Sequence, residues 1–264
     1  MKLTFLGTGA DDWDWKASPS GPRRSTCSLL GSSCLLDAGP CVLHGLAAAH
    51  VPPARIRDLL LTHSHSDHCN VPAILDIARA GRRRLRVWAA PQALALLADA
   101  ASGPAAFEPH PVLPGDEFRV AGLRALALPA NHAVVSRPDE QPMHYVFAGR
   151  GTRLLYALDG GWLCAKARIL LKQFLEGKPL SAIVWDATCG NTFRDWRFAE
   201  HNDLRMIDAM RESMLKLNLV APETVHVFDH IARTLWPKTP AAQLRLAERF
   251  HGVLAQDGLT LPDL

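Results

Sequence analysis

The chain has 264 residues, of which 48% are hydrophobic and 21% charged, and its formal net charge is +3. This composition is typical of a globular protein with a sizeable core and argues against disordered, collagen-like and coiled-coil classes. The small net charge does not indicate a nucleic-acid partner by itself, and no window holds the ~20 consecutive apolar residues of a membrane-spanning helix.

Short apolar runs rich in branched residues alternate along the chain with longer helical patterns. The predicted strands are Leu3–Leu6, Cys27–Leu36, Leu59–Thr62, Leu85–Trp88, Phe118–Leu128, Tyr145–Ala148, Leu154–Leu158, Ile183–Trp185 and Val225–Phe228. The predicted helices are Cys41–His50, Val71–Ala80, Gln92–Ala101, Ala165–Leu175, Asp203–Leu217 and Ala241–Leu254. Single strands before helices, together with paired strands, predict an α/β fold with mixed sheets.

No stretch resembles an interdomain linker, so residues 1–264 are expected to form a single domain. The most irregular segment is Ala10–Ser25. Long irregular loops in compact domains often carry functional residues. A mobile surface loop that one tryptophan holds in place is an equally good interpretation of this segment.

The six cysteines are spread thinly and include no CxxC pair. This spacing argues against a disulfide scaffold and against a thiolate zinc site. The apolar run at the N-terminus is too short for a signal peptide. A cytoplasmic protein with no membrane partner is therefore expected.

The unusual feature of the composition is its twelve histidines, and the most informative of them follow an apolar strand. His63, His65, Asp67 and His68 come within one run of six residues. Imidazole nitrogen and carboxylate oxygen suit zinc and other first-row divalent ions. His63 and His65 are two residues apart, so in an extended segment their side chains share one side and can bind one ion. Asp67 and His68 come where the chain turns toward a helix, which suits a second, adjacent ion.

The run HSHSDH resembles the HxHxDH signature of the metallo-β-lactamase fold hydrolases, and the likeness extends over nearly the whole chain. The resemblance implies a four-layer αββα sandwich of two mixed sheets. It also implies two divalent metal ions between the sheets, Zn²⁺ in the first place and Mn²⁺ as the alternative. It assigns one ion to His63, His65 and His132, the other to Asp67, His68 and His230, and the bridging position to Asp159.

Two further carboxylates are candidates for supporting the metal ligands. Asp37 lies in a segment, LLDAG, that is similar to the family's "LIDAG", whose aspartate usually supports the metal-binding loop. Asp186 lies in VWDATCG, after a predicted strand. Both could orient metal-binding imidazoles.

Within the superfamily, the chain looks most like the cyclic-phosphate phosphodiesterase of the carbon–phosphorus lyase pathway and its relatives. The segment HNDL, from His201 to Leu204, resembles that group's NHNDL. In that group the histidine assists phosphodiester cleavage, so His201 is expected to be catalytic, together with the metal-binding Asp67. The structural alternative for His201 is a place beside the N-cap of the following helix.

The sequence also departs from that group. The relatives hold a structural zinc with a cysteine-rich N-terminal loop and a histidine three residues after the last ligand. Here the loop has no cysteine and the later position is Arg233, so no third zinc is expected. Leu158-Asp159-Gly160-Gly161 also replaces the usual Ser-Asp-Thr. The candidate substrate contacts are Trp13, Trp15, Arg23, Arg24 and His144.

The leading hypothesis is a dinuclear metal-dependent phosphodiesterase. A water between two divalent ions loses a proton near neutral pH and becomes a hydroxide nucleophile, and protonated His201 can donate toward the leaving alkoxide. The expected partner is a small phosphodiester, cyclic ones included, and a homodimer is open because dimers are common among similar proteins. 

Three alternatives remain. The first is an RNA-processing nuclease of the RNase Z type, although the chain has no visible basic, Gly-rich arm. The second is a thioester or lactone hydrolase, and the third is a non-catalytic metal-binding member of the fold.

Overall fold

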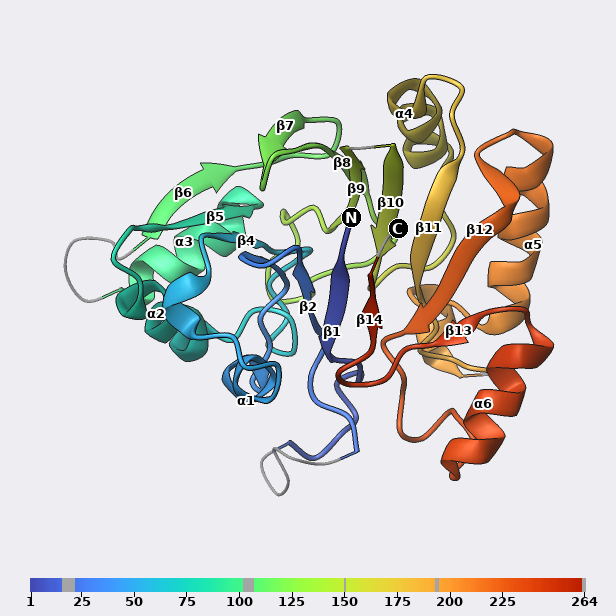
Figure 1. Ribbon diagram of the computed structural model, residues 1–264, viewed down its shortest axis with the longest axis horizontal. Helices are drawn as coiled ribbons and strands as arrows, with labels where there is room; N and C mark the ends of the chain where they lie inside the picture. Colours follow the sequence, from blue (N-terminus) through green and yellow to red (C-terminus); the bar gives the residue numbers. More distant parts are fainter. Residues whose placement is uncertain (16–21, 102–106, 150, 193–194, 263–264) are drawn as a thin grey trace. The chain divides into compact units, whose positions relative to one another are not determined.

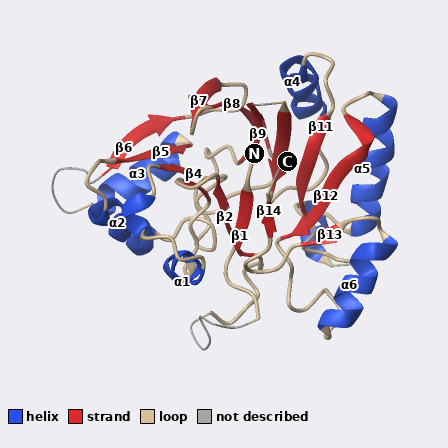
Figure 2. Cartoon of the chain, in the orientation of Figure 1, coloured by secondary structure: helices blue, strands red, loops and turns tan. Residues whose placement is uncertain are grey.

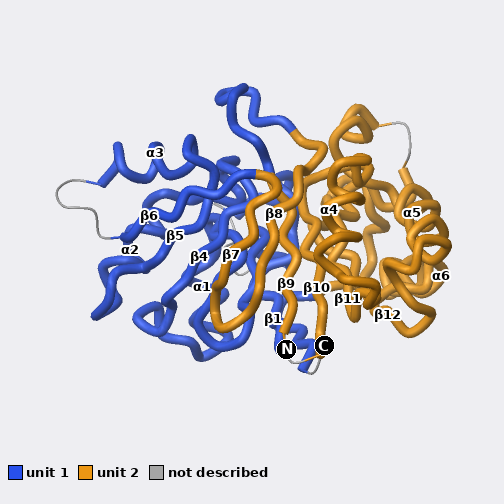
Figure 3. Tube along the Cα trace, turned by 90° about the horizontal axis from the view of Figure 1, so that it is seen from above, with its two compact units in different colours: residues 1–113, 133–142, 256–263 blue, residues 114–132, 143–255, 264 orange. Residues whose placement is uncertain are grey.

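The computed structural model describes residues 1–15, 22–101, 107–149, 151–192 and 195–262. The chain forms two compact units (Figure 3): residues 1–113, 133–142 and 256–263 make up unit 1, and residues 114–132, 143–255 and 264 make up unit 2. Each unit contains one sheet together with the helices that pack on it (Figure 2). The expectation of a single domain stays a prediction.

The sheet of unit 1 is mixed. In the described residues it has seven strands, in the order β14-β1-β2-β3-β4-β5-β6 (Figure 1). Neighbours from β14 to β3 are antiparallel, and neighbours from β3 to β6 are parallel. The strands are β1 (Leu3–Gly7), β2 (Cys27–Leu30), β3 (Cys34–Leu36), β4 (Asp58–Leu60), β5 (Leu85–Ala89), β6 (Phe107–Pro111) and β14 (Thr260–Leu261).

Helices of unit 1 bury their apolar sides against this sheet. They are α1 (Val42–Ala48), α2 (Val71–Ala80) and α3 (Pro91–Ala100), with a short 3₁₀ helix at Pro53–Arg55. One core joins Leu46, Ile74 and Leu97 of the three helices to strand residues such as Leu35 and Val87. Helix α2 starts where the side chain of Asn70 accepts a hydrogen bond from the backbone N–H of Ala73, which satisfies one of the unpaired donors of the first turn.

The sheet of unit 2 has the same pattern. Its described strands lie in the order β13-β12-β11-β10-β9-β8-β7. Neighbours from β7 to β10 are antiparallel, and neighbours from β10 to β13 are parallel. The strands are β7 (Glu117–Val120), β8 (Leu123–Pro129), β9 (Met143–Gly149), β10 (Thr152–Ala157), β11 (Leu180–Asp186), β12 (Val220–Asp229) and β13 (Val253–Leu254).

Helices α4 (Ala165–Leu175), α5 (Leu204–Lys216) and α6 (Pro240–Arg249) pack on the sheet of unit 2, and a 3₁₀ helix at Trp196–Ala199 precedes α5. A second core joins Leu171 of α4, Ile207 of α5 and Ala247 of α6 to Trp185 and Phe228 of the strands. None of the helices in the described part of the chain has the length and apolar character needed to cross a membrane.

The α/β fold with mixed sheets confirms the sequence prediction. The differences concern element limits and the strands β6, β13 and β14, which the sequence patterns did not predict. The run Cys27–Leu36 is two strands joined by a turn at residues 31–33, and Phe118–Leu128 is likewise a hairpin. The helix predicted over Ala241–Leu254 ends at Arg249, because the chain turns at His251 (φ 52°) and continues as β13. Strand β6 was not expected because prolines interrupt it, and prolines are tolerated only where a strand lies at a sheet edge, as β6 does.

Candidate metal centre

The loop between β4 and α2 carries four candidate ligands of unit 1. His63, Asp67 and His68 are buried, and His65 is half-buried. Nε2 of His63 lies 2.9 Å from Nδ1 of His65, and Nε2 of His68 lies 3.3 Å from Oδ2 of Asp67. The loop therefore holds its donor atoms in two close pairs, the same pairs that the sequence spacing predicts.

Asp37 supports this loop from the end of β3. Its Oδ1 accepts a hydrogen bond from the backbone N–H of Thr62 at 2.8 Å, and its Oδ2 lies 2.9 Å from Nδ1 of His68. The hydroxyl of Thr62 in turn lies 3.0 Å from Nδ1 of His63. Because Nδ1 of both imidazoles meets these partners, Nε2 is the nitrogen of each ring that can bind an ion.

Three parallel strands of unit 2 end at one edge of their sheet and bring further candidates together. Asp159 follows β10, Asp186 is the last residue of β11, and His230 follows β12. Nε2 of His230 lies 3.0 Å from Oδ1 of Asp159. Each of these residues and His201 offers a ligand atom, and the four atoms lie within 4.8 Å of one another. Functional groups commonly gather at the carboxyl ends of parallel strands.

His201 is paired with Asp186. Its Nδ1 lies 2.7 Å from Oδ2 of Asp186, whose side chain is fully buried. Burial alone would lower the pKa of His201, but the charge of Asp186 and this hydrogen bond raise it above its usual value. Burial by itself would raise the pKa of Asp186, and His201 outweighs that effect and lowers it. With Nδ1 engaged, Nε2 is the nitrogen of His201 that can exchange a proton with a ligand.

Thr188 connects this pair to His230, and sequence reasoning did not find it. Its hydroxyl donates to Oδ1 of Asp186 at 2.7 Å and lies 2.7 Å from Nδ1 of His230. With Nδ1 facing this hydroxyl, Nε2 is the nitrogen of His230 that is directed toward Asp159 and that would bind a metal ion. The only sequence signal is its place two residues after Asp186, which is too common to single out a threonine.

His132 follows β8 and also reaches Asp159. Its Nε2 lies 3.7 Å from Oδ2 of Asp159, and its Nδ1 lies 3.2 Å from Oε2 of Glu200. The ring therefore resembles that of His68, since a carboxylate lies near Nδ1 and another faces Nε2. Glu200 is a second partner that sequence reasoning missed.

The first three residues of the HNDL segment each make a different contact. His201 meets Asp186, and the side-chain amide of Asn202 donates to the backbone oxygen of Gly160 at 2.8 Å. Asp203 is the N-cap of α5, where it accepts from the backbone N–H of Met206. His201 thus lies two residues before the N-cap, near the place expected as its structural alternative, and its catalytic role stays a prediction.

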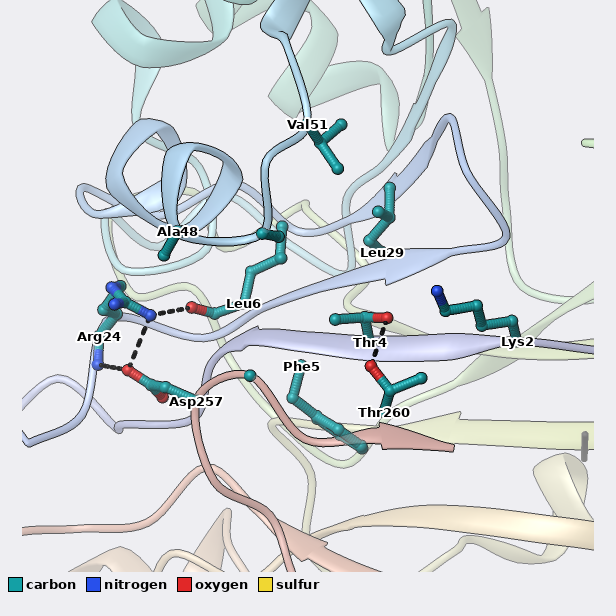
Figure 4. Close-up of a pocket in the computed structure, with 13 residues that line it drawn as sticks. Lys2, Thr4, Phe5, Leu6, Arg24, Leu29, Ala48, Val51, Asp257 and Thr260 are labelled. Atoms are coloured by element: carbon teal, nitrogen blue, oxygen red, sulfur yellow. Dashed lines mark hydrogen bonds and ion pairs between the residues drawn. The ribbon is translucent and has the colours of Figure 1, made fainter. Parts of the chain in front are cut away.

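The candidate substrate contacts of the N-terminal segment lie in unit 1. Arg23 is buried and donates to Thr8, while Arg24 pairs with Asp257 at 3.4 Å and lines a cavity of about 350 Å³ (Figure 4). Trp13 is half-buried and Trp15 is 9% exposed. Residues 16–21 of the predicted loop Ala10–Ser25 lie outside the described residues. Substrate contact by these four residues stays a prediction.

His144 lies in β9 of unit 2 and is buried. A Cβ atom at position 160 would overlap Nε2 of its ring. The imidazole of His144 thus fills the space that a side chain after Asp159 would need, which accounts for glycine at 160 where the resembled group has a larger residue. A substrate contact by His144 also stays a prediction.

The donor set fits divalent transition-metal ions. It consists of imidazole nitrogens and carboxylate oxygens, which suit zinc. Outer partners orient the rings of metal-binding histidines in known sites, and here Thr62, Asp37 and Thr188 meet Nδ1 of His63, His68 and His230.

Solved structures of several proteins share this fold. Zn²⁺-bound PqqB from Methylobacterium extorquens is 19% identical, with a TM-score of 0.73 and all of both chains covered. The short form of human tRNase Z (ELAC1) is 15% identical, with a TM-score of 0.71 over 99% of this chain and 98% of that one. A diphosphatase from the PhnP family is 18% identical, with a TM-score of 0.67 over 98% of this chain and 96% of that one.

No curated protein sequence matches the chain. The profile described as the beta-lactamase superfamily domain matches residues 33–176, a range that includes β3 to α4 and therefore the HSHSDH loop, His132 and Asp159. The fold found in the solved structures is the metallo-β-lactamase fold, in agreement with the sequence resemblance. The chain belongs to the beta-lactamase superfamily.

Proposed function

We propose that the protein is a dinuclear metal-dependent phosphodiesterase that cleaves a small phosphodiester. The observation that carries the proposal is the pair of His201 and Asp186, joined at 2.7 Å and lying beside Asp159 and His230. His201 lies outside the ligand set that the family resemblance assigns, so its imidazole, held by a buried carboxylate beside those ligands, is free for proton transfer. Hydrolysis of an ester needs a proton donor for the leaving oxygen, and this pair supplies one.

The proposed ligand assignment follows the family resemblance. His63, His65 and His132 are assigned to one ion, Asp67, His68 and His230 to the other, and Asp159 to both. Zinc is the proposed metal, with manganese as the alternative. When bound, such ions supply Lewis-acid chemistry, activating water and drawing charge from phosphoryl oxygens.

The residues of the chain have distinct tasks in this reaction. Asp186 keeps His201 protonated and fixes its ring through Nδ1, so that Nε2 presents the proton to the leaving oxygen. Thr188 and Asp37 fix the tautomers of His230 and His68. Asn202 fixes the Gly160 backbone next to Asp159 through its amide. These contacts hold the reacting groups in place before substrate binds, which is where electrostatic catalysis gains most.

The solved structures are consistent with the proposal but do not select the substrate. One of them is named a diphosphatase, one a tRNase, and one carries zinc. Each name describes that protein. A phosphorus-centred reaction is common to the first two names, and it is the class of reaction proposed for this chain.

A substrate panel with matched variants tests the proposal. Zinc-loaded protein is expected to hydrolyse bis(p-nitrophenyl) phosphate and cyclic ribose phosphates faster than tRNA precursors or thioesters. His201→Ala should lower kcat by about 100-fold, the lower range for general acid catalysis, with zinc content unchanged. His44→Ala, an exposed histidine of α1, is the control and should match the wild type.

Two results would contradict the proposal. The first is turnover of tRNA precursors or thioesters alone, which would assign the protein to one of the other hydrolase classes. The second is absence of turnover of every phosphodiester by fully metallated protein. Loss of zinc in His201→Ala would make His201 a metal ligand instead of a proton donor.

A further inference from the structure

Ser64 separates the two histidines of the first ligand pair. In an extended segment successive side chains point to opposite sides, so Ser64 points away from the side that His63 and His65 share. Its side chain is nevertheless buried, with 5% of the residue exposed. A buried hydroxyl needs hydrogen-bond partners. Those partners therefore contact the metal-binding loop on the side opposite to His63 and His65.

The partners come from the segment 133–142, which belongs to unit 1 although it lies far along the chain. Two consecutive turns shape it. The backbone N–H of Arg137 donates to the oxygen of Val134 at 2.8 Å, and that of Glu140 donates to the oxygen of Arg137 at 2.9 Å. The side chain of Gln92 in α3 holds the second turn by donating to the backbone oxygen of Asp139 at 3.1 Å.

These turns bring the carboxylate of Glu140 and the guanidinium of Arg137 to the hydroxyl of Ser64. The hydroxyl of Ser64 donates to Oε2 of Glu140, and Nη1 of Arg137 donates to the Ser64 oxygen at 3.2 Å. The single hydrogen of the hydroxyl and one of its lone pairs are both used, so the orientation of Ser64 is fixed. Glu140 is only 5% exposed, and its Oε1 has no hydrogen-bond partner among the described residues. A buried carboxylate is costly, and the hydrogen bond that the side chain of Glu140 makes with Ser64 is to the metal-binding loop.

We propose that Glu140 is a positioning residue of the metal centre. Through Ser64, it holds the backbone between His63 and His65 in the conformation in which Nε2 of one and Nδ1 of the other lie 2.9 Å apart. Asp37 supports the loop at Thr62 and His68, and Glu140 supports it at the residue between the first two ligands. The inference rests on the proposed function, because it concerns the metal ions that this function requires.

Zinc affinity in the absence of substrate tests the inference. The zinc dissociation constant is measured by competition with a chromophoric chelator, and the geometry of the site by the visible spectrum of the Co²⁺-substituted protein. Glu140→Gln should weaken zinc binding by about 10-fold, as substitutions behind metal ligands do, and should change the Co²⁺ spectrum. Asp139→Asn removes a charge from the same turn without touching Ser64, and it should leave both readouts at the wild-type value.

Ser64→Ala removes the donor of the hydrogen bond between Ser64 and Glu140. This variant provides a second measurement of zinc affinity if Glu140→Gln fails to fold. Glu140→Gln keeps an acceptor oxygen but removes its charge. Because both substitutions act on one hydrogen bond, the double variant should bind zinc no more weakly than Ser64→Ala alone. Wild-type affinity and spectrum in both single variants would overturn the inference, and so would an equal loss in Asp139→Asn.

The metal measurement separates this inference from the proposed function. A protein that binds zinc and hydrolyses no phosphodiester contradicts the proposed function alone, since the affinities of the variants are still compared. A wild-type protein that binds no divalent metal overturns both.

Discussion

At the scale of single residues, three candidate site residues have an unusual backbone. Asp37, Asp159 and His230 have φ angles of 60°, 47° and 57°, a left-handed conformation that costs a non-glycine residue on the order of 1 kcal/mol or more. Each lies within two residues of the end of a strand. Side chains along a strand point alternately to the two faces of the sheet. The left-handed turn ends this alternation, so the side chain is released from it at the edge of the sheet. Such strain often clusters at functional sites, and these three residues that show it belong to the candidate metal centre.

Burial makes the contribution of His226 to the stability of the protein depend on pH. It lies in β12, is 6% exposed and accepts a hydrogen bond from the indole N–H of Trp185. Burial, and secondarily the charge of Arg211, lower its pKa from 6.5 to about 4. The unfolded chain therefore binds a proton between pH 6.5 and pH 4 that the folded protein does not. The contribution of neutral His226 to stability is complete above pH 6.5 and is lost as the pH falls toward 4.

His226→Asn should reduce this acid sensitivity. The wild type should lose on the order of 3 kcal/mol more than the variant between pH 7 and pH 4, the equivalent of the lowered pKa. Urea unfolding at several pH values measures the difference, and the exposed His44→Asn is the control that should keep the wild-type slope. Parallel pH profiles of wild type and His226→Asn would show that His226 does not titrate in this way.

At the scale of elements, helix α5 is connected to the candidate site by its cap. Asp203, the N-cap, is buried and accepts from the backbone N–H of Met206 at 2.7 Å. The two preceding residues are His201 and Asn202, which contact Asp186 and Gly160. The start of the helix therefore fixes the position of the proposed proton donor, so the loss of the cap should affect more than stability.

Asp203→Ala is expected to lower the free energy of unfolding by about 1 kcal/mol and also to lower kcat. Thr239→Ala removes the cap of α6, where Thr239 accepts from the N–H of Ala242, and should lower stability with kcat unchanged. Thermal unfolding and steady-state kinetics of both variants make the comparison. Equal kcat in the two variants would show that the cap of α5 has no influence on His201.

Sequence patterns located most elements but missed those whose limits depend on distant contacts. Helices α2 and α4 have the predicted limits because apolar periodicity and flanking residues agree there. The apolar residues Val253 and Leu254 continue the pattern of α6, yet they pair with β12, a partner that local periodicity does not reveal. In the same way, the motif residues pointed to the candidate site, whereas Thr188, Glu200 and Glu140 are recognised only through contacts with residues remote in the sequence.

At the scale of the whole chain, the two sheets are built alike. Each has antiparallel neighbours at one end and parallel neighbours at the other. In each unit the candidate groups follow the carboxyl ends of the parallel strands, after β3 and β4 in unit 1 and after β10, β11 and β12 in unit 2. The family resemblance assigns metal ligands to both sets of residues, and the proposed reaction requires two bound ions.

Zinc titration of metal-free protein tests that requirement most directly. The rate of bis(p-nitrophenyl) phosphate hydrolysis is followed as zinc is added in fractions of an equivalent, with bound zinc measured in parallel. The account predicts activity that rises until about two equivalents are bound, the number in a dinuclear site, and that a chelator reverses. Protein that binds two equivalents of zinc without hydrolysing the diester, or that hydrolyses it equally well without metal, would contradict the account.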